Sequence, residues 1–346
     1  MTDYLRGRQQ QVKVGDYLSD SVSITYGVPQ GSVLGPTLFL IYINDLCALS
    51  IPKCDIFTYA DDTALIFHGD TWDDTRLISE HGLNIVTSWL KTNILTLNIS
   101  KTLFVPFAIN KSTCPPPNYT IRAHTDYNYC NADCTCESIP RSEKVKYLGV
   151  TLDSNLSWHD HIMHISDRTR KLIWIFKKLR HAANIKLLIS TYKALAQCVV
   201  TYCISVWGGA CKTKLILLER SQRALIKVML FKKFRFSTFP LYNTNRLLTV
   251  RQLYLLNLIL RTHKIIPFKK INIVKKRKGR KDMVCSKPKC RTAFAKRQFP
   301  NQSAYLYNKI NSNLEIHTMM LRDVRNAVTN WLFLLDYDST EKLLLR

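Results

Sequence analysis

Two adjacent carboxylates, Asp61 and Asp62, stand in the middle of an otherwise apolar stretch, residues 54–67. The Tyr, Ile, Phe and Thr residues on both sides favour β-structure, so the stretch predicts a hairpin with the two carboxylates at its tip. Mg²⁺ prefers oxygen ligands in an octahedral arrangement and is commonly held by one or two carboxylates together with substrate phosphates. The pair is therefore a candidate metal site for phosphoryl transfer. The alternative is a solvated turn, the commoner role of an Asp-Asp pair between two strands.

A glycine-rich segment precedes this hairpin. Residues 27–35 contain three Gly and one Pro, which allow a sharp turn and a close approach of the backbone to a ligand. The alternative is an ordinary turn that opens a buried helix. Ser32 leads into an apolar stretch that predicts a helix through Leu46, with Pro36 in its first turn. The apolar side chains of this helix are predicted to be core: Leu38, Phe39, Ile41, Tyr42 and Leu46.

The residues after the hairpin predict a helix and then a strand. Apolar residues recur at helical spacing over residues 72–92, with acidic residues at the front, and Asn93 ends the pattern. Leu95, Leu97 and Ile99 then alternate with polar residues, which predicts a strand. Asn98 and Lys101 would be delivered at the end of that strand.

Four segments, in this order along the chain, resemble successive motifs of reverse transcriptases from non-LTR (LINE-like, jockey or CR1-type) retrotransposons. They are residues 26–36, the Tyr59-Ala60-Asp61-Asp62 hairpin, residues 97–102 and residues 146–153. Further matches downstream are less specific and comprise Tyr202, Trp207-Gly208 and Gln222-Arg223-Ala224. The resemblance implies an RNA-directed DNA polymerase that transfers nucleotides from dNTPs to a primer 3′-hydroxyl by a two-metal mechanism.

The resemblance also implies roles for single residues. Asp61 would bind Mg²⁺, with Asp62 supporting the metal site, and Lys101 would stabilise the charge that develops on the leaving pyrophosphate. The residues implied in nucleotide or template binding are Gln30, Gly31, Tyr59 and Asn98.

In this family a strand upstream of the glycine-rich segment carries the first metal-binding Asp. The acidic residues before Gly27 are Asp3, Asp16 and Asp20, and none stands in a β-branched run. By the resemblance, we expect an N-terminally truncated fragment that lacks the fingers region and has an incomplete two-ion Mg²⁺ site. The alternative is a catalytically dead retrotransposon remnant that only binds nucleic acid.

Composition points to a polyanionic partner. Fifty Lys and Arg against 25 Asp and Glu leave a formal net charge of +25, and residues 269–297 carry 13 basic residues against one acidic residue. Such a surface favours nucleic acid, here an RNA template and a DNA primer. No apolar run has the length of a membrane span and no signal peptide is visible, so no membrane partner is expected. Eleven Cys, an odd number, fit reduced thiols and an intracellular location, in the nucleus, the cytoplasm or both, rather than secretion.

These observations predict an α+β chain of four regions. Residues 1–110 would be a partial polymerase palm, an antiparallel sheet with helices, and residues 111–141 an inserted loop or ragged hairpin. Residues 142–235 would hold a primer-grip hairpin and a helical thumb, and residues 236–346 a basic helical C-terminal region with helices near 305–310 and 317–335. Two metal sites, one of Cys130, Cys134 and Cys136 and one of His159, His161 and His164, are weighed as alternatives to loop and packing roles.

Overall fold

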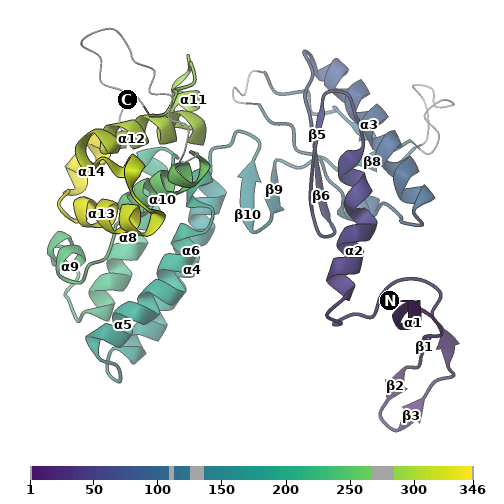
Figure 1. Cartoon of the computed structure of the whole chain (residues 1–346), viewed down its shortest axis with the longest axis horizontal. Coiled ribbons are helices and arrows are strands. Elements are labelled where there is room, and N and C mark those ends of the chain that lie inside the picture. Colours follow the sequence, from purple (N-terminus) through teal and green to yellow (C-terminus); the bar gives the residue numbers. More distant parts are fainter. Residues whose placement is uncertain (1, 109–112, 125–135, 267–283, 345–346) are drawn as a thin grey trace. The chain divides into compact units, whose positions relative to one another are not determined.

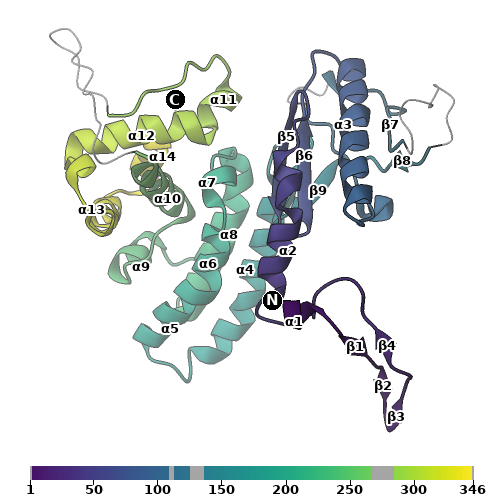
Figure 2. The same cartoon turned by 45° about the vertical axis from the view of Figure 1, so that its right-hand side comes forward.

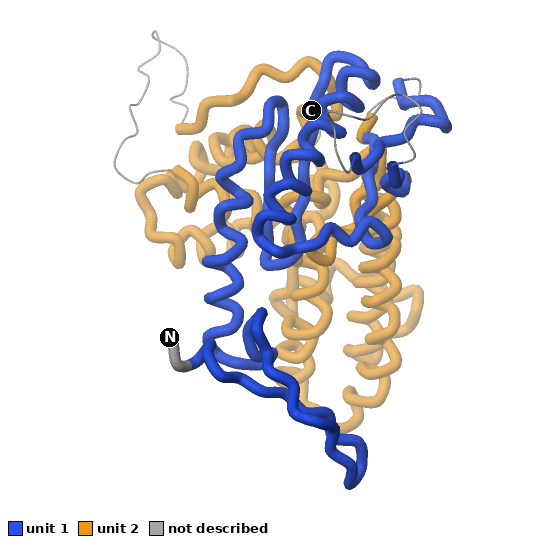
Figure 3. Tube along the Cα trace, turned by 90° about the vertical axis from the view of Figure 1, so that its right-hand side faces the viewer, with its two compact units in different colours: residues 1–106, 112–142 blue, residues 107–111, 143–346 orange. Residues whose placement is uncertain are grey.

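The computed structural model describes residues 2–108, 113–124, 136–266 and 284–344, and the chain divides into two compact units. Unit 1 consists of residues 1–106 and 112–142, and unit 2 of residues 107–111 and 143–346 (Figure 3). Helices and antiparallel strands both occur, so the predicted mixed helix and strand class is confirmed. Among the described residues, no helix has the length and the apolar content needed to cross a membrane.

Unit 1 begins with a short helix, α1 (Thr2–Leu5), and a narrow ribbon of paired strands (Figure 1). β1 (Gln9–Gln10) pairs with β4 (Val22–Ser23), and β2 (Lys13–Val14) pairs with β3 (Tyr17–Leu18). All eight residues of these strands are exposed. The ribbon therefore adds nothing to the apolar core of the unit.

The core of unit 1 is built by a hairpin and the helices that pack against it. α2 (Gly35–Ile43) continues into the 3₁₀ helix η1 (Asn44–Ala48), and α3 (Trp72–Thr92) follows the hairpin of β5 (Cys54–Tyr59) and β6 (Asp62–Phe67). Ile43, Leu46, Ile51 and Val86 are buried together, and Ile56, Leu65 and Phe67 of the hairpin pack against them.

Helix α3 confirms the prediction for residues 72–92. Thr71 caps its first turn, because the Thr71 hydroxyl accepts a hydrogen bond from the Asp74 N–H at 3.1 Å. Gly82 allows close packing on β6, since a Cβ at this position would lie 2.5 Å from the ring of Phe67. The helix ends at Asn93, as the sequence indicated.

The core prediction for α2 is wrong at two residues. Ile41 is 65% exposed and Tyr42 is 44% exposed, whereas Leu38 and Phe39 are half-buried and Leu46 is buried. Apart from Thr37 the α2 sequence has no polar side chain beyond the Tyr42 hydroxyl, so it lacks a polar face that would show which side meets the hairpin. Composition alone could not separate the buried face from the exposed one.

The strand predicted over residues 95–99 does not form. Leu95, Leu97 and Ile99 are half-buried and alternate with exposed neighbours, but no described segment pairs with them. The chain instead closes into the 3₁₀ helix η2 (Ile99–Lys101), which Asn98 caps. Periodicity predicted the burial pattern, but a strand also requires a partner for its backbone.

The described part of the predicted insert contributes to the core of unit 1. β7 (Ile121–Arg122) pairs with β8 (Ser138–Ile139), and the side chains of Tyr119, Ile121 and Ile139 are buried with Leu83 of α3. The Glu80 carboxylate of α3 accepts a hydrogen bond from the Arg122 N–H at 3.0 Å. Cys130 and Cys134, two members of the possible zinc site, lie outside the described residues.

Unit 2 begins with a second hairpin. β9 (Lys144–Tyr147) pairs with β10 (Val150–Asp153), and the two turn residues, Leu148 and Gly149, have φ values of 45° and 81°. A two-residue turn with both central residues at positive φ matches the twist of the flanking strands. The predicted hairpin over residues 144–153 is confirmed.

The rest of unit 2 is helical, as predicted for residues 161–230 and for the two C-terminal segments. In chain order the elements are α4 (His159–Leu179), α5 (Ile185–Tyr192), the π-helix η5 (Lys193–Gln197), α6 (Cys198–Thr201), α7 (Ile204–Trp207), α8 (Lys212–Met229), α9 (Phe239–Thr244), α10 (Val250–Ile265), α11 (Ala293–Arg297), α12 (Phe299–Leu314), η6 (Ile316–Thr318), α13 (Leu321–Phe333) and α14 (Tyr337–Leu344). α4 and α8 pack side by side (Figure 2).

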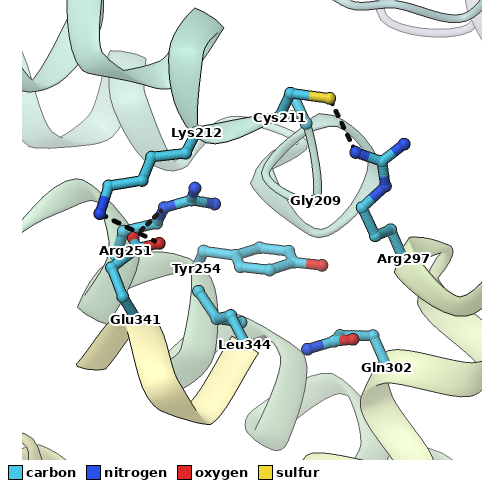
Figure 4. Close-up of a pocket in the computed structure, with 10 residues that line it drawn as sticks. Gly209, Cys211, Lys212, Arg251, Tyr254, Arg297, Gln302, Glu341 and Leu344 are labelled. Atoms are coloured by element: carbon cyan, nitrogen blue, oxygen red, sulfur yellow. Dashed lines mark hydrogen bonds and ion pairs between the residues drawn. The ribbon is translucent and has the colours of Figure 1, made fainter. Parts of the chain in front are cut away.

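Helix α10 is the centre of unit 2. Twelve of its 16 residues are buried, and it packs against α7, α12 and α13. Thr249 and Gln252 form a capping box at its start. A helix that is buried nearly all round must satisfy its polar side chains internally, and Arg251 does so through ion pairs with two acids. The Arg251 Nε lies 2.7 Å from the Oε1 of Glu341 (Figure 4). The same Nε lies 3.8 Å from the Oε1 of Glu219.

Candidate active site

The two carboxylates predicted as catalytic lie at the tip of the β5–β6 hairpin. Only Ala60 and Asp61 separate the strands, and Ala60 has a φ of 53°. Asp61 is therefore in the turn, and Asp62 begins β6 directly opposite Tyr59. Both carboxylates are exposed, and no ion pair joins either one to another described side chain. The predicted hairpin with Asp at its tip is confirmed.

The two faces of this hairpin have different surroundings. The inner face, with Ile56, Leu65 and Phe67, packs on the core of unit 1 and fixes the position of the tip. The outer face carries Phe57, 51% exposed, and Tyr59, 66% exposed. Among the described residues no third strand pairs with β5 or β6. An exposed apolar face thus lies beside two acidic groups, an arrangement that could hold the base or sugar of a nucleotide next to its phosphates.

The hairpin tip has the right donor chemistry for a divalent cation but not a full set of ligands. Asp61 and Asp62 offer hard carboxylate oxygens, which suit Mg²⁺. No group of three or more His, Cys, Asp or Glu side chains in the described part of the chain is arranged to hold a metal ion. A metal at this tip would need additional ligands, from substrate phosphates or from another carboxylate.

Gln30 and Gly31 lie in the loop before α2. Gly27 and Gly31 have φ values of 81° and 79°, so both occupy the left-handed region that favours glycine, and a Cβ at either would meet nothing within 4 Å. Gln30 lines a hollow of about 680 Å³ that Arg8 also lines. The Arg8 guanidinium donates a hydrogen bond to the Gly27 carbonyl at 2.6 Å.

Arg8 was not singled out from the sequence. The stretch from Arg8 to Val14 resembles the segment that precedes the glycine-rich motif in non-LTR reverse transcriptases, but the resemblance assigns Arg8 no role in a site. Ser32 holds the same loop in shape, because its hydroxyl accepts hydrogen bonds from Tyr4 at 2.6 Å and from the Gly35 N–H at 3.1 Å.

Asn98 and Lys101 lie on η2. The Asn98 Oδ1 accepts hydrogen bonds from the Ser100 hydroxyl at 2.7 Å and from the Lys101 N–H at 3.2 Å. This oxygen is used for capping, which leaves the amide NH₂ for any ligand. The Lys101 ammonium is exposed.

The predicted site residues thus occupy three places in unit 1: the hairpin tip, the glycine-rich loop and η2. No hydrogen bond or ion pair between described side chains joins these three places. Tyr59 and Asp62 are brought opposite each other by strand register, and Ile99 of η2 packs with Leu65 of β6 in one apolar cluster.

Of the downstream residues, Tyr202 and Trp207 have structural contacts. The Tyr202 hydroxyl donates to the Leu148 carbonyl at 2.7 Å, which connects the β9–β10 hairpin to the helices of unit 2. Trp207 is fully buried and its indole N–H donates to the Tyr202 carbonyl at 2.9 Å.

Gln222 is a buried hydrogen-bonding centre. Its amide NH₂ donates to the Tyr192 hydroxyl and to the Leu248 carbonyl, both at 2.9 Å. Its carbonyl oxygen accepts from the Tyr242 hydroxyl at 2.9 Å and from the Val250 N–H at 3.2 Å. These contacts join α5, α8, α9 and the start of α10.

His161 has packing contacts, and no group of three or more His, Cys, Asp or Glu in the described part of the chain could hold a metal ion. Its Nδ1 accepts a hydrogen bond from the Thr151 N–H at 3.3 Å, and its ring meets Trp207 edge-on with the centroids 5.5 Å apart. Burial, with a smaller effect from the charge of His164, lowers the pKa of His161 from 6.5 to about 4.

Comparisons with known proteins support the family resemblance that the order of motifs indicated. Residues 3–152 match the family of the reverse transcriptase (RNA-dependent DNA polymerase). The chain is 25% identical over 236 residues to the probable RNA-directed DNA polymerase from transposon X-element of Drosophila melanogaster, which covers 66% of this chain and 24% of that protein. It is 28% identical over 225 residues to the RNA-directed DNA polymerase from mobile element jockey of the same species, covering 61% of this chain and 22% of that protein.

A third relative is the probable RNA-directed DNA polymerase from transposon BS of Drosophila melanogaster, 26% identical over 239 residues, with 65% of this chain and 25% of that protein covered. The match therefore spans a quarter or less of each of these three relatives. No solved structure matches the chain. Residues 3–152 are thus similar to the reverse transcriptase family, and the chain is similar to the RNA-directed DNA polymerases of the jockey, X-element and BS elements.

Proposed function

We propose that this chain is part of an RNA-directed DNA polymerase that extends a primer 3′-hydroxyl with dNTPs on an RNA template. The observation that carries the proposal is the β5–β6 hairpin, which presents Asp61 and Asp62 to solvent from a rigidly packed base. It lies inside the region that matches the reverse transcriptase family.

Asp61 and Asp62 are proposed to hold the divalent ion, Mg²⁺, which would supply charge stabilisation at the phosphates. Asp61 is the more direct ligand because it stands in the turn, whereas Asp62 is held in the first pair of the β-ladder. The exposed face of Tyr59 beside them is proposed to contact the nucleotide.

Lys101 is proposed to act on the leaving group. Its ammonium would donate a proton to, or balance the charge of, the departing pyrophosphate. Support comes from its exposure at the end of η2 and from the anchoring of η2 by Ile99 in the same cluster as β6. Gln30 and Gly31, on the open glycine-rich loop, and the free amide NH₂ of Asn98 are proposed to contact template or nucleotide.

The direct test is dNTP incorporation on an RNA template, with and without Mg²⁺, by a polypeptide that contains this chain. Lys101→Ala should slow the chemical step in a single-turnover assay more than it weakens dNTP binding. Lys13→Ala, which removes an exposed Lys from the ribbon, is the matched control. An equal effect of the two substitutions would remove Lys101 from the mechanism.

The second candidate function is nucleic-acid binding without catalysis. It is favoured by the net charge of +25 and by the missing third metal ligand in the described residues. Salt-dependent binding with no incorporation by any polypeptide that contains this chain would favour it. For either function we propose an intracellular location, in the nucleus, the cytoplasm or both, on the basis of the odd number of Cys.

A further inference from the structure

The connection between α8 and α9 has an unusual composition. Residues 231–236, here called the aromatic–basic loop, read Phe-Lys-Lys-Phe-Arg-Phe, so three aromatic rings are interleaved with three cations and no acid is present. All six residues are exposed. Phe231 is 55% exposed, Phe234 89% and Phe236 41%. Three large apolar side chains in six residues therefore face water, a grouping typical of interaction sites.

The backbone of the loop is held in place. The Lys232 N–H donates to the Lys227 carbonyl at 2.8 Å, which closes the end of α8, and the Phe236 N–H donates to the Lys233 carbonyl at 3.0 Å. Phe231 has a φ of 53°, a conformation that is costly for a bulky residue. The rings are thus displayed from an ordered turn.

The aromatic surface extends onto α4. The guanidinium of Arg180 lies 4.3 Å from the ring centre of Phe231, and the ring of His181 meets Phe231 edge-on with the centroids 5.1 Å apart. Arg180 and His181 follow the C-terminal end of α4, and Lys178 and Trp174 share one face of its last turns because they are four residues apart. Trp174 is 64% exposed, and the Lys178 ammonium lies 4.3 Å from its ring centre.

We propose that the aromatic–basic loop and Trp174 form a binding site for single-stranded nucleic acid. Bases stack on exposed rings whatever their sequence, while interleaved cations neutralise the phosphates between them. The loop supplies aromatic rings and cations within six residues, and its positive charge is complementary to the phosphates of a single strand. Duplex nucleic acid has its bases already stacked on one another, so it gains little from the rings. The site does not involve the hairpin tip, and the proposal goes beyond the polymerase reaction.

The experiment is fluorescence anisotropy of the full chain with a labelled single strand of about 12 nucleotides, within the ~4–16 that such a site covers. Phe234→Ala should weaken single-strand binding by about 5- to 150-fold, the loss expected for one base–aromatic stack, and leave duplex binding unchanged. Phe234→Tyr should keep the affinity. Leu334→Ala, which removes another exposed apolar side chain, 81% exposed, is the matched control and should change nothing.

The contributions of charge and of base stacking to single-strand binding can be measured separately within the same site. Lys233→Gln should lower the slope of log K against log salt by about 0.7, the value for one phosphate contact on a single strand, whereas Phe234→Ala should leave the slope unchanged. Neither measurement depends on dNTP incorporation, so the outcome is independent of the polymerase proposal. Wild-type affinity of Phe234→Ala for the single strand, or an equal loss on single strand and duplex, would overturn the inference. Binding of anionic lipid vesicles that depends on Phe234, without loss of single-strand affinity, would also overturn it.

Discussion

Replacing Gln222 by Leu should destabilise unit 2 more than most single substitutions can. Gln222 is 1% exposed and makes four hydrogen bonds, two as donor and two as acceptor. Leu fits a similar volume but leaves the Tyr242 hydroxyl and the Val250 N–H without acceptors. It also removes the donor to the Leu248 carbonyl.

The size of the effect follows from these unsatisfied groups. An unsatisfied buried donor costs about 1–3 kcal/mol, so the two donors together cost about 2–6 kcal/mol. The added apolar burial of Leu offsets about 1 kcal/mol of this. A loss of roughly 3 kcal/mol in the free energy of unfolding is expected, which for a unit of this size lowers Tm by about 6–12 °C.

Urea denaturation followed by circular dichroism measures this change. Arg220→Leu is the matched control, since it places Leu at an exposed position of the same helix and should stay within about 0.5 kcal/mol of the wild type. If Gln222→Leu also stayed within that range, the four-bond arrangement around Gln222 would be refuted.

Three further predictions concern pH, ion pairing and salt. The folded-state pKa of His161, about 4, is below its unfolded value of 6.5, so the unfolded state binds more protons between these two pH values. The stability that neutral His161 provides is therefore lost as pH falls from 6.5 to 4. Thermal denaturation of His161→Gln should show a weaker pH dependence of stability in this window, and an unchanged dependence would contradict the lowered pKa of His161. Arg251→Met should cost about 3–5 kcal/mol in urea denaturation, because it removes the cation 2.7 Å from the Glu341 carboxylate and leaves only Lys212, at 4.0 Å, as its ion-pair partner. Adding Glu341→Gln should recover part of the loss, and no recovery would show that Arg251 and Glu341 are not coupled. Deleting residues 269–297, with 13 basic residues, should reduce the salt dependence of nucleic-acid binding in anisotropy titrations, and an unchanged slope would exclude this segment from the interface.

The parts of the fold that could be predicted are those specified by local pattern. The hairpin of residues 54–67 was predictable because apolar residues flank a polar tip, and α3 because acids precede an apolar stripe that ends at Asn93. The order of motifs also pointed to the family that residues 3–152 resemble, because four weak matches in one order are specific together.

The parts that could not be predicted depend on partners distant in sequence. Residues 95–99 have a strand-like alternation, but no described segment offers them a ladder of hydrogen bonds. The structural role of Gln222 depends on residues 20–30 positions away along the chain. The composition of the aromatic–basic loop is visible in the sequence, but the exposure of its three Phe rings depends on how the chain folds between α8 and α9.

In the candidate site, too, the features set by local sequence were predictable and those set by the rest of the fold were not. Sequence placed Asp61 and Asp62 correctly at a tip, since the turn is local. It could not show that the Oδ1 of Asn98 is used for capping, or that Arg8 lines the same hollow as Gln30. Both facts depend on how the backbone closes around these residues.

The central claim is that Asp61 binds a catalytic metal ion, and primer extension on an RNA template tests it most directly. Asp61→Asn, in a polypeptide that supports extension, should reduce the single-turnover rate by at least about 100-fold, because even groups that only support a metal ligand are worth about 10- to 100-fold. Asp55→Asn is the matched control, as it changes an exposed Asp of the same hairpin away from the tip, and it should retain the wild-type rate. Wild-type rates for both variants would contradict the account and leave the hairpin tip as a solvated turn.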